Sequence, residues 1–430
     1  MRRLRLGSIF QSFLLSLIFC SSSFPIIYID INAPSIKKLK VAIADFFPMD
    51  KDEKRKDLSE RLPMVIRNDL LLSGYFKVIE KEAYLTKKTH FERPNLADWS
   101  AIGADLLIVG RYRTIGESLQ VEVRMYDVYW GKRIFGKRAL GKVRYYRYVM
   151  HRIDDEIIKE LTGEEGIFST KIAFVSDRTG NKEIYIADYD GYNVKQITFH
   201  RSISILPSIS PDGKKLVYTS YTKKGPVLYI KDLESGKERI LSSRPGLNSA
   251  ASWSPDGKML AITLSLKGNP DIYLIDTEGN IIKRLTKYWG IDTAPCFSPD
   301  GKKIAFVSNR SGSPQIYVHE LETGREYRIT YEGKYNSSPS WSKLNIIAYS
   351  CMIEDHFDIC TIKPDGTDMK RLTRNKGNDE NPCWSPDGRY IIFTSNRTGR
   401  YQLYIMTANG MNQTRITSFE GNQTDPFWSR

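Results

Sequence analysis

The chain has 430 residues, of which 41% are hydrophobic and 12% aromatic, and its formal net charge at pH 7 is +14. This length exceeds that of one ordinary globular domain, and the composition is that of a folded chain, so both favour two domains and argue against disorder. A basic balance is typical of nucleic-acid binding. Here the export predicted below argues against a nucleic-acid partner, and Lys and Arg are scattered among acids, as over residues 51–56, which favours a solvated surface. Anionic envelope surfaces and acidic protein partners are left open as ligands of this charge.

The first residues predict export across a membrane. Three arginines within the first five residues precede an apolar stretch over residues 9–19, and small residues follow at 20–23. This order is typical of a secretory signal peptide, which we place at residues 1–23. The apolar run is too short to span a bilayer comfortably, so the mature protein is expected to be peripheral to the envelope and not membrane-spanning.

The region after the signal peptide divides into a short arm and a domain. Residues 24–39 form the predicted arm, in which Ile27, Ile29 and Ile31 alternate with polar neighbours as in a strand. Residues 40–165 form a predicted α+β domain, in which Gly74 and Gly163 are suited to end the first and last helices. Its strands are expected near residues 40–46, 75–80, 104–110 and 119–125, and its helices near 58–73, 96–102 and 153–161.

The rest of the chain, predicted as residues 166–430, repeats one short phrase. Ser-Pro-Asp-Gly begins at Ser210, Ser254, Ser298 and Ser385, and a reduced form stands at Ser342 and Ser429. Successive serines are 44, 44, 44, 43 and 44 residues apart. A fixed period of this length is the signature of a β-propeller, in which each repeat is one four-stranded blade.

Turn and strand patterns within the repeats predict the number of blades. Pro presets the second position of a type I turn, and Asp and Gly suit the next two positions, so the phrase closes a hairpin. Six apolar strand cores recur at matching positions, such as 184–186, 272–274 and 403–405, which predicts six blades. The repeats start on a second strand near Ile172 and finish on a first-strand sequence at residues 425–429. The last strand is therefore expected to complete the first blade and close the ring.

The loops between blades are predicted to form the binding surface. Strand order puts the Ser-Pro-Asp-Gly turns on one face and the inter-blade loops on the other. The turns are nearly constant among the repeats and the loops vary, which favours specific recognition by the loops. Several apolar loop residues are expected to converge on the channel mouth as a patch for a protein partner: Ile203, Ile205, Leu247, Trp289, Ile291 and Tyr335. The alternative is that they fill the mouth by packing against one another.

Catalytic and metal-binding patterns are not found in the sequence. The chain has no Gly-x-Ser-x-Gly elbow, and its five histidines lack metal-ligand spacing. We therefore predict that the protein is not an enzyme and needs no metal or cofactor. Calcium binding by Asp188 and Asp190 is left open, although this pattern more commonly forms a solvated turn without a metal ion. A disulfide between Cys351 and Cys360 is also left open, since an oxidising compartment permits one.

Several segments carry a resemblance to a known family. They are residues 99–105 with 107–110, which read Trp-Ser-Ala-Ile-Gly-Ala-Asp and Leu-Ile-Val-Gly, then Leu161-Thr162-Gly163, and Asp-Tyr-Asp-Gly-Tyr-Asn at 188–193. On these residues the chain resembles the TolB family of the Gram-negative Tol-Pal system over essentially its whole mature length. The resemblance implies a mainly β fold, with a small α+β domain before a six-bladed propeller, and a periplasmic location. We expect a monomer.

The resemblance also implies two partner sites. In the family, the amino-terminal arm binds the inner-membrane protein TolA, and Ile27, Tyr28, Ile29, Asp30 and Ile31 occupy that place here. The propeller mouth binds the peptidoglycan-associated lipoprotein Pal, and matching positions here are Leu247, Asn248, Ala250, Asp292 and Thr293. Together with the loop residues Ile205, Trp289, Ile291, Tyr335 and Asn336, they form the predicted mouth site.

The function implied is that of a non-enzymatic scaffold. It supports outer-membrane integrity and constriction during cell division. The rival reading is an exported β-propeller hydrolase that acts on glycans or peptides, which scattered carboxylates do not exclude.

Overall fold

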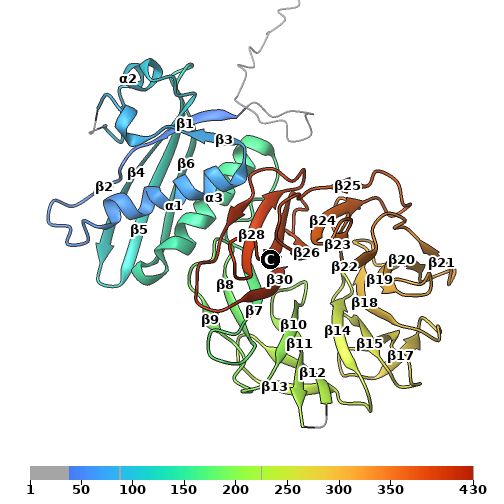
Figure 1. The fold of residues 1–430 in the computed structure, drawn as a ribbon. Helices are drawn as coiled ribbons and strands as arrows, with labels where there is room; N and C mark the ends of the chain where they lie inside the picture. The colour runs from blue at the N-terminus through green and yellow to red at the C-terminus, as the bar shows by residue number, and fades with distance from the viewer. Residues whose placement is uncertain (1–37, 87–88, 224, 430) are drawn as a thin grey trace, which may run out of the picture.

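The computed structural model of the chain describes residues 38–86, 89–223 and 225–429. The fold is mainly β: a domain of helices and strands precedes a six-bladed β-propeller (Figure 1). The fold class expected from the sequence is confirmed. The predicted signal peptide and the predicted TolA-like site at residues 27–31 lie outside the described residues.

A mixed sheet forms the centre of the amino-terminal domain. Its strands are β1 (Leu39–Ile43), β2 (Phe47–Pro48), β3 (Phe76–Val78), β4 (Leu106–Ile115), β5 (Ser118–Asp127) and β6 (Lys132–Lys142). The strand order is β3-β1-β4-β5-β6, and β2 pairs with β4. β1 runs parallel to β3 and β4, whereas β4, β5 and β6 form an antiparallel meander. β6 is thus the edge strand at the β5 end of the sheet. The strands predicted from the sequence do not include this segment.

Helices cover both faces of this sheet. They are α1 (Leu58–Ser73), α2 (Leu96–Ala101) and α3 (Tyr146–Thr162), with short 3-10 turns at Lys81–Ala83 and Val143–Tyr145. Ile66 of α1 and Ile157 of α3 share one buried core with the sheet, and Trp99 of α2 belongs to a second core on the opposite face. Gly74 and Gly163 end the long helices with left-handed backbone, at φ 77° and 74°, as expected.

Six antiparallel four-stranded sheets, here called blades 1 to 6, form the propeller (Figure 1). Blade 1 is β30 (Gln423–Ser429), β7 (Lys171–Ser176), β8 (Glu183–Asp188) and β9 (Lys195–Gln196); blade 2 is β10 (Ser204–Ile209), β11 (Lys215–Thr222), β12 (Gly225–Asp232) and β13 (Glu238–Ser242). Blade 3 is β14 (Asn248–Trp253), β15 (Met259–Leu264), β16 (Asp271–Asp276) and β17 (Ile281–Arg284); blade 4 is β18 (Asp292–Phe297), β19 (Lys303–Ser308), β20 (Gln315–Glu320) and β21 (Glu326–Arg328). Blade 5 is β22 (Tyr335–Trp341), β23 (Ile347–Met352), β24 (Phe357–Ile362) and β25 (Lys370–Arg371); blade 6 is β26 (Asp379–Trp384), β27 (Tyr390–Ser395), β28 (Gln402–Thr407) and β29 (Thr414–Arg415). The first strands of neighbouring blades lie side by side and line the channel.

The Ser-Pro-Asp-Gly turns are held by hydrogen bonds among their own residues. In blade 3, Ser254 Oγ donates to Asp256 Oδ1 at 2.6 Å, and the same carboxylate accepts the backbone N–H of Lys258 at 3.1 Å. Ser254 Oγ also accepts the N–H of Met259 at 3.0 Å, where the second strand begins. The same bonds recur at Ser210, Ser298 and Ser385. The repeated phrase is therefore a structural device that closes the first hairpin of a blade.

The last strand completes the first blade, as predicted. β30 pairs antiparallel with β7, so that Trp428 lies opposite Ile172 and Gln423 opposite Ser176. Trp428 is buried, and its indole N–H donates to Thr170 Oγ1 at 2.8 Å. Sheet pairing between residues from the two ends of the repeat region leaves no open edge where the ring begins and ends.

The cysteines after the predicted signal peptide fall into two groups. Cys351 of β23 and Cys360 of β24 form a disulfide with their Cα atoms 5.9 Å apart, which settles the alternative left open by the sequence. Cys296 and Cys383 are free thiols on first strands. Burial raises the pKa of Cys296 to about 12 and that of Cys383 to about 11, so both are unreactive at neutral pH.

Candidate partner-binding site

A ring of bulged backbone surrounds the mouth of the channel. Each first strand has a β-bulge shortly after its start. One non-glycine residue in each bulge has left-handed backbone, with φ between 48° and 54°: Leu206, Ala250, Ala294, Ser338, Asn381 and Asp425. Such a conformation is unfavourable for these residue types and is retained where surrounding structure enforces it. Six repetitions give the mouth a fixed backbone outline.

The side chains of this ring divide into a polar half and an apolar half. Ser338 Oγ donates to Asn381 Oδ1 at 2.8 Å, and Asn381 Nδ2 donates to Asp425 Oδ1 at 2.7 Å, which links blades 5, 6 and 1. Burial raises the pKa of Asp425 to about 6. Leu206, Ala250 and Ala294 form the other half, in blades 2, 3 and 4. The ring therefore offers hydrogen-bond partners on one side and apolar contact on the other.

The predicted mouth residues with the most exposed side chains are apolar. Trp289 is 78% exposed, Ile291 47%, Ile203 44% and Tyr335 40%, and all four lie where a loop runs into the first strand of blade 2, 4 or 5. Four more predicted residues are half-buried around the same mouth: Ile205, Leu247, Ala250 and Thr293. A large part of each of the four exposed apolar side chains therefore faces solvent.

Three predicted mouth residues are buried and support the loops from beneath. Asn248 Nδ2 donates to the carbonyl of Arg244 at 2.7 Å, and Asn336 Nδ2 donates to Gln315 Oε1 at 2.7 Å. Asp292 pairs with Arg310 at 2.9 Å. Because all three side chains have 0% exposure, they present no surface to a partner, and their expected role as contacts is corrected to one of positioning.

A repeat comparison could have revealed these supporting residues. The six first strands carry a buried polar residue at the equivalent position: Ser204, Asn248, Asp292, Asn336, Asp379 and Gln423. A polar type kept at one position in every blade indicates a hydrogen bond that every blade needs. Beyond the mouth, the channel holds a cavity of about 620 Å³ toward the turn face, lined by prolines and tryptophans of the first strands.

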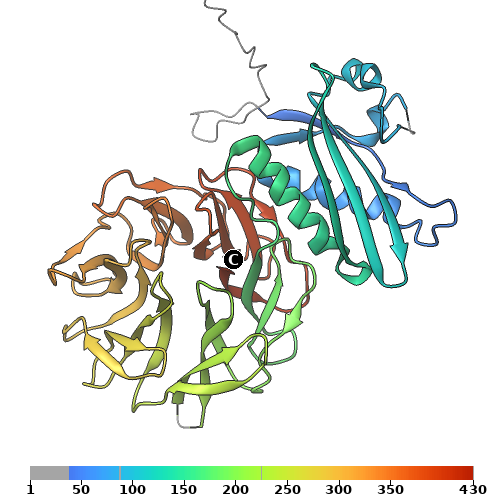
Figure 2. The ribbon, with the colours of Figure 1, turned by 180° about the vertical axis from the view of Figure 1, so that it is seen from behind.

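The amino-terminal domain packs on the turn face, where it shares a buried polar cluster with blade 1. Asp69 of α1 accepts a hydrogen bond from the Tyr189 hydroxyl at 2.8 Å and lies 2.7 Å from Nδ1 of His151 of α3. Arg147 of α3 pairs with Asp190, which adjoins Tyr189 in the turn after β8. All five side chains are buried. We call these residues and the neighbouring Asp154 of α3 the junction cluster. They join two helices to a propeller turn, and Figure 2 shows the helices beside the propeller.

Proton binding in the junction cluster is shifted by burial and by neighbouring charge. Asp154 of α3 is fully buried, and burial together with the Asp69 carboxylate raises the pKa of Asp154 well above its usual range. Burial opposes the charged form of His151, but Asp69 and Asp190 outweigh burial, so the pKa of His151 is raised as well. Both shifts favour proton binding by the folded chain.

The two carboxylates of the propeller turn at this junction already have protein donors. Asp188, one of the two residues left open for calcium, accepts bonds from Lys171 and from Asn193 Nδ2, the latter at 2.5 Å. Asp190, the other, accepts from Arg147. His151 and these two aspartates have ligand atoms within 4.8 Å of one another. Donors from Lys, Arg and Asn supply the charge and hydrogen bonds that a cation would provide, so the geometry favours an ion-paired turn.

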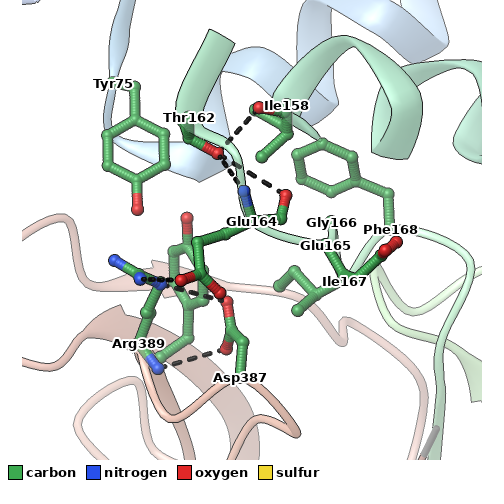
Figure 3. Close-up of a pocket in the computed structure, with 11 residues that line it drawn as sticks. Tyr75, Ile158, Thr162, Glu164, Glu165, Gly166, Ile167, Phe168, Asp387 and Arg389 are labelled. Atoms are coloured by element: carbon green, nitrogen blue, oxygen red, sulfur yellow. Dashed lines mark hydrogen bonds and ion pairs between the residues drawn. The ribbon is translucent and has the colours of Figure 1, made fainter. Parts of the chain in front are cut away.

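A second contact joins the amino-terminal domain to blade 6 (Figure 3). The Tyr390 hydroxyl donates to the carbonyl of Ser73, the last residue of α1, at 2.8 Å. Arg389 lies 3.8 Å from Glu164 and 3.9 Å from Asp387. The cavity among these side chains is about 10 Å³, room for one water at most. This region is a packed domain contact and not a ligand pocket.

Comparison with known proteins places this fold in a family. A family model described as the TolB amino-terminal domain matches residues 27–134, and one described as the TolB beta propeller domain matches residues 158–430. By its sheet topology, the chain is a six-bladed β-propeller protein with an amino-terminal α+β domain. The chain belongs to the TolB family.

Individual relatives agree with this assignment. The Tol-Pal system protein TolB of Geobacter sulfurreducens is 50% identical over 376 residues, which is 86% of each chain. Proteins of the same name from Desulfosudis oleivorans and Syntrophotalea carbinolica are each 40% identical to this chain. The Desulfosudis match covers 47% of this chain and 47% of the relative, and the Syntrophotalea match covers 48% of this chain and 49% of the relative. The chain thus spans about half the length of each of these two relatives. The crystal structure of TolB from Acinetobacter baumannii matches with a TM-score of 0.81 and 29% identity, over 94% of this chain and 99% of that one. Within the described ranges, no helix has the length and apolar character needed to cross a membrane.

Proposed function

We propose that this protein is a non-enzymatic periplasmic scaffold of the Tol-Pal envelope system. It binds a Pal-like outer-membrane lipoprotein at the propeller mouth and a TolA-like inner-membrane protein through the arm at residues 24–39. By doing so it supports outer-membrane integrity and constriction during cell division. Membership of the TolB family supports the system, since the relatives are named as Tol-Pal components and not as enzymes.

The observation that carries the mouth assignment is a set of large apolar side chains held in the open on a rigid base. Trp289, Ile291 and Tyr335 are exposed, while Asn248 and Asp292 are buried beneath the same loops. Aromatic and branched side chains on a preformed surface are typical anchors of a protein interface, because little conformational entropy is lost when they bind. The polar half of the bulged ring supplies hydrogen-bond partners beside them.

A set of contacts links the strand that follows the arm to the turn face of the propeller. The arm precedes β1, and β1 pairs with β3, which follows α1. α1 carries Asp69, which contacts Tyr189 of blade 1. We infer that occupation of the mouth changes arm exposure through this junction. The word allostery applies if each partner changes the affinity of the other by the same factor.

Selective loss of one partner tests the two-site proposal. Deleting residues 25–34 from the mature protein is expected to abolish binding of the TolA-like protein and to leave binding of the Pal-like lipoprotein unchanged, as measured by isothermal titration calorimetry. Equal loss of both affinities would contradict two separate sites.

An envelope extract distinguishes the scaffold from a hydrolase. Immobilised mature protein is expected to recover an outer-membrane lipoprotein, identified by mass spectrometry, and to leave peptidoglycan fragments and peptides intact. Turnover of either substrate by the purified protein would favour the hydrolase.

A further inference from the structure

The amino-terminal domain has a long sheet edge that the described residues leave unpaired. β6 (Lys132–Lys142) pairs with β5 on one side, and within residues 38–86, 89–223 and 225–429 no strand pairs with its other side. An edge strand presents alternate backbone N–H and C=O groups outward and can accept one more strand. In the propeller, by contrast, the inner edge of each sheet faces neighbouring blades across the channel.

This edge carries a concentration of positive charge. Five of the 11 residues of β6 are Lys or Arg, and none is acidic. Lys137 is paired with Glu156 at 2.6 Å, and Arg138 with Glu122 at 2.5 Å. Across the described residues, Arg133, Lys142 and the nearby Arg152 of α3 have no ion pair, and Arg133 and Lys142 are exposed. The edge is therefore electrostatically complementary to an acidic ligand.

A groove beside the edge adds apolar contact. A cavity of about 410 Å³ lies between β6 and α3, lined by residues that include Leu140, Tyr145, Tyr148 and Arg152. Leu140 is 74% exposed, and both tyrosines are also exposed. Gly141 permits this arrangement, because a Cβ there would lie 2.4 Å from Val149 Cγ2 and push α3 away. One wall of the groove is thus hydrogen-bonding backbone, and the other is an aromatic and basic helix face.

Lysines on an edge strand also have a simpler role, which is to prevent pairing between copies of a protein. Protected edges are short or lack exposed apolar side chains. Here the strand has 11 residues and adjoins exposed Leu140 and Tyr145. A protective role does not explain an apolar groove that runs along the same edge.

We propose that β6 and α3 form a docking site for an extended, acidic polypeptide segment. The segment adds as a further strand beside β6, its carboxylates face Arg133, Lys142 and Arg152, and its alternate apolar side chains enter the groove under α3. Main-chain pairing gives the affinity and the groove gives the selectivity, as in other cases of strand addition. This surface is separate from the propeller mouth, and its residues are not those of the predicted arm. It gives the amino-terminal domain of this chain a partner contact of its own.

The test uses the mature protein and an acetylated, fluorescently labelled peptide of alternating Glu and Val. Fluorescence anisotropy is expected to show saturable binding, and hydrogen–deuterium exchange is expected to slow at residues 132–142. A peptide with Lys in place of Glu, and a Glu–Val peptide methylated at alternate backbone nitrogens, are expected to bind at least tenfold more weakly. Equal binding of the methylated peptide, or slowed exchange elsewhere only, overturns strand addition.

Charge reversal on the protein completes the test. R152E is expected to weaken peptide binding at least tenfold and to leave the melting temperature unchanged, since Arg152 is exposed and has no ion pair among the described residues. K77E, at an exposed lysine of β3 on the opposite edge, is the matched control and should bind as the wild type does. Phosphatidylglycerol vesicles are a second probe. Binding of vesicles without binding of the acidic peptide would assign the basic edge to lipid and overturn the proposal.

Discussion

The two faces of the propeller are built from the same six repeats and serve different purposes. On the turn face, Ser-Pro-Asp-Gly turns bond within themselves, and two turns carry the amino-terminal domain through Tyr189 and Tyr390. On the loop face, buried polar residues such as Asn248 fix the loops from below, and Trp289 extends into solvent. Residues that recur in every blade build the framework, whereas residues that differ between blades are the ones we propose for recognition.

This division predicts that stability and partner binding can be altered separately. A substitution on the turn face should change the free energy of unfolding and not the affinity, and an exposed substitution on the loop face should do the reverse. A change in ring closure should alter both, since it removes the framework of each face.

Loss of the closing strand is expected to have the largest effect. Deleting residues 422–430 removes β30 from blade 1 and exposes an inner edge to solvent. The free energy of unfolding is expected to fall by about 5 kcal/mol or more, because truncating one buried Trp alone costs about 3–5 kcal/mol. Thermal denaturation followed by circular dichroism measures this. An unchanged midpoint would contradict closure by β30; W428F, which keeps the ring and loses the bond to Thr170, is the mild control.

An exposed anchor at the mouth should affect binding only. W289A is expected to weaken affinity for the Pal-like lipoprotein by about 10- to 100-fold, or about 1.4–2.8 kcal/mol, because a large desolvated aromatic contact is lost. The melting temperature should stay the same, since the side chain is 78% exposed. Calorimetric titration gives the affinity, and Y129A, at an exposed tyrosine of the other domain, is the control. Wild-type affinity in W289A would remove Trp289 from the site.

The junction on the turn face should respond to pH. The folded-state pKa values of Asp154 and His151 are raised, so their contributions to stability are complete below the unfolded pKa values, about 4 for Asp and 6.5 for His, and are lost as pH rises through the folded values. D154N keeps the shape without the charge. We expect the decrease in stability between pH 5 and 9 to be smaller in D154N than in the wild type, because an Asn side chain does not ionise.

Urea denaturation at several pH values measures this slope. D98N, in α2 and away from the junction, is the control and should follow the wild type. A wild-type slope in D154N would show that Asp154 does not titrate in the folded protein over this range.

A single turn substitution should give the smallest change. D256A removes the acceptor for Ser254 Oγ and for the Lys258 N–H, at an expected cost of about 1 kcal/mol in the free energy of unfolding. Lipoprotein affinity should stay at the wild-type value, because the turn lies on the face opposite the mouth. Urea titration and calorimetry report the two quantities, and D256N, which keeps one acceptor oxygen, should lie between D256A and wild type. A large loss of affinity in D256A would break the separation of the faces.

The propeller was largely predictable because its information is repeated. Six serines at a near-constant period gave the blades, and the first-strand sequence before Ser429 gave the closure. β6 was not predicted, because Ile134, Phe135, Ala139 and Leu140 come in adjacent pairs that do not alternate; pairing with β5 makes this segment a strand. In β6, pairing with the neighbouring strand β5 determines the secondary structure, and the local sequence pattern does not.

Which residues of the candidate site are buried also could not be predicted from the sequence. Asn248 and Ala250 lie two residues apart in one strand, yet one is fully buried and the other half-buried beside the bulge. The junction cluster combines Asp69 with Tyr189, 120 positions apart, so no local spacing marks it. Periodicity locates the mouth, and only three-dimensional packing separates the exposed residues of the mouth from the buried residues that hold the loops.

Closure by the final strand also constrains how the protein matures. Gln423 bonds to Ser176 across 247 positions, so the ring cannot be sealed until β30 has been synthesised. Until then blade 1 has three strands and an unpaired β7, which is open to proteases and to other chains. We therefore expect chains that end before β30 to be more sensitive to proteases than chains that contain it.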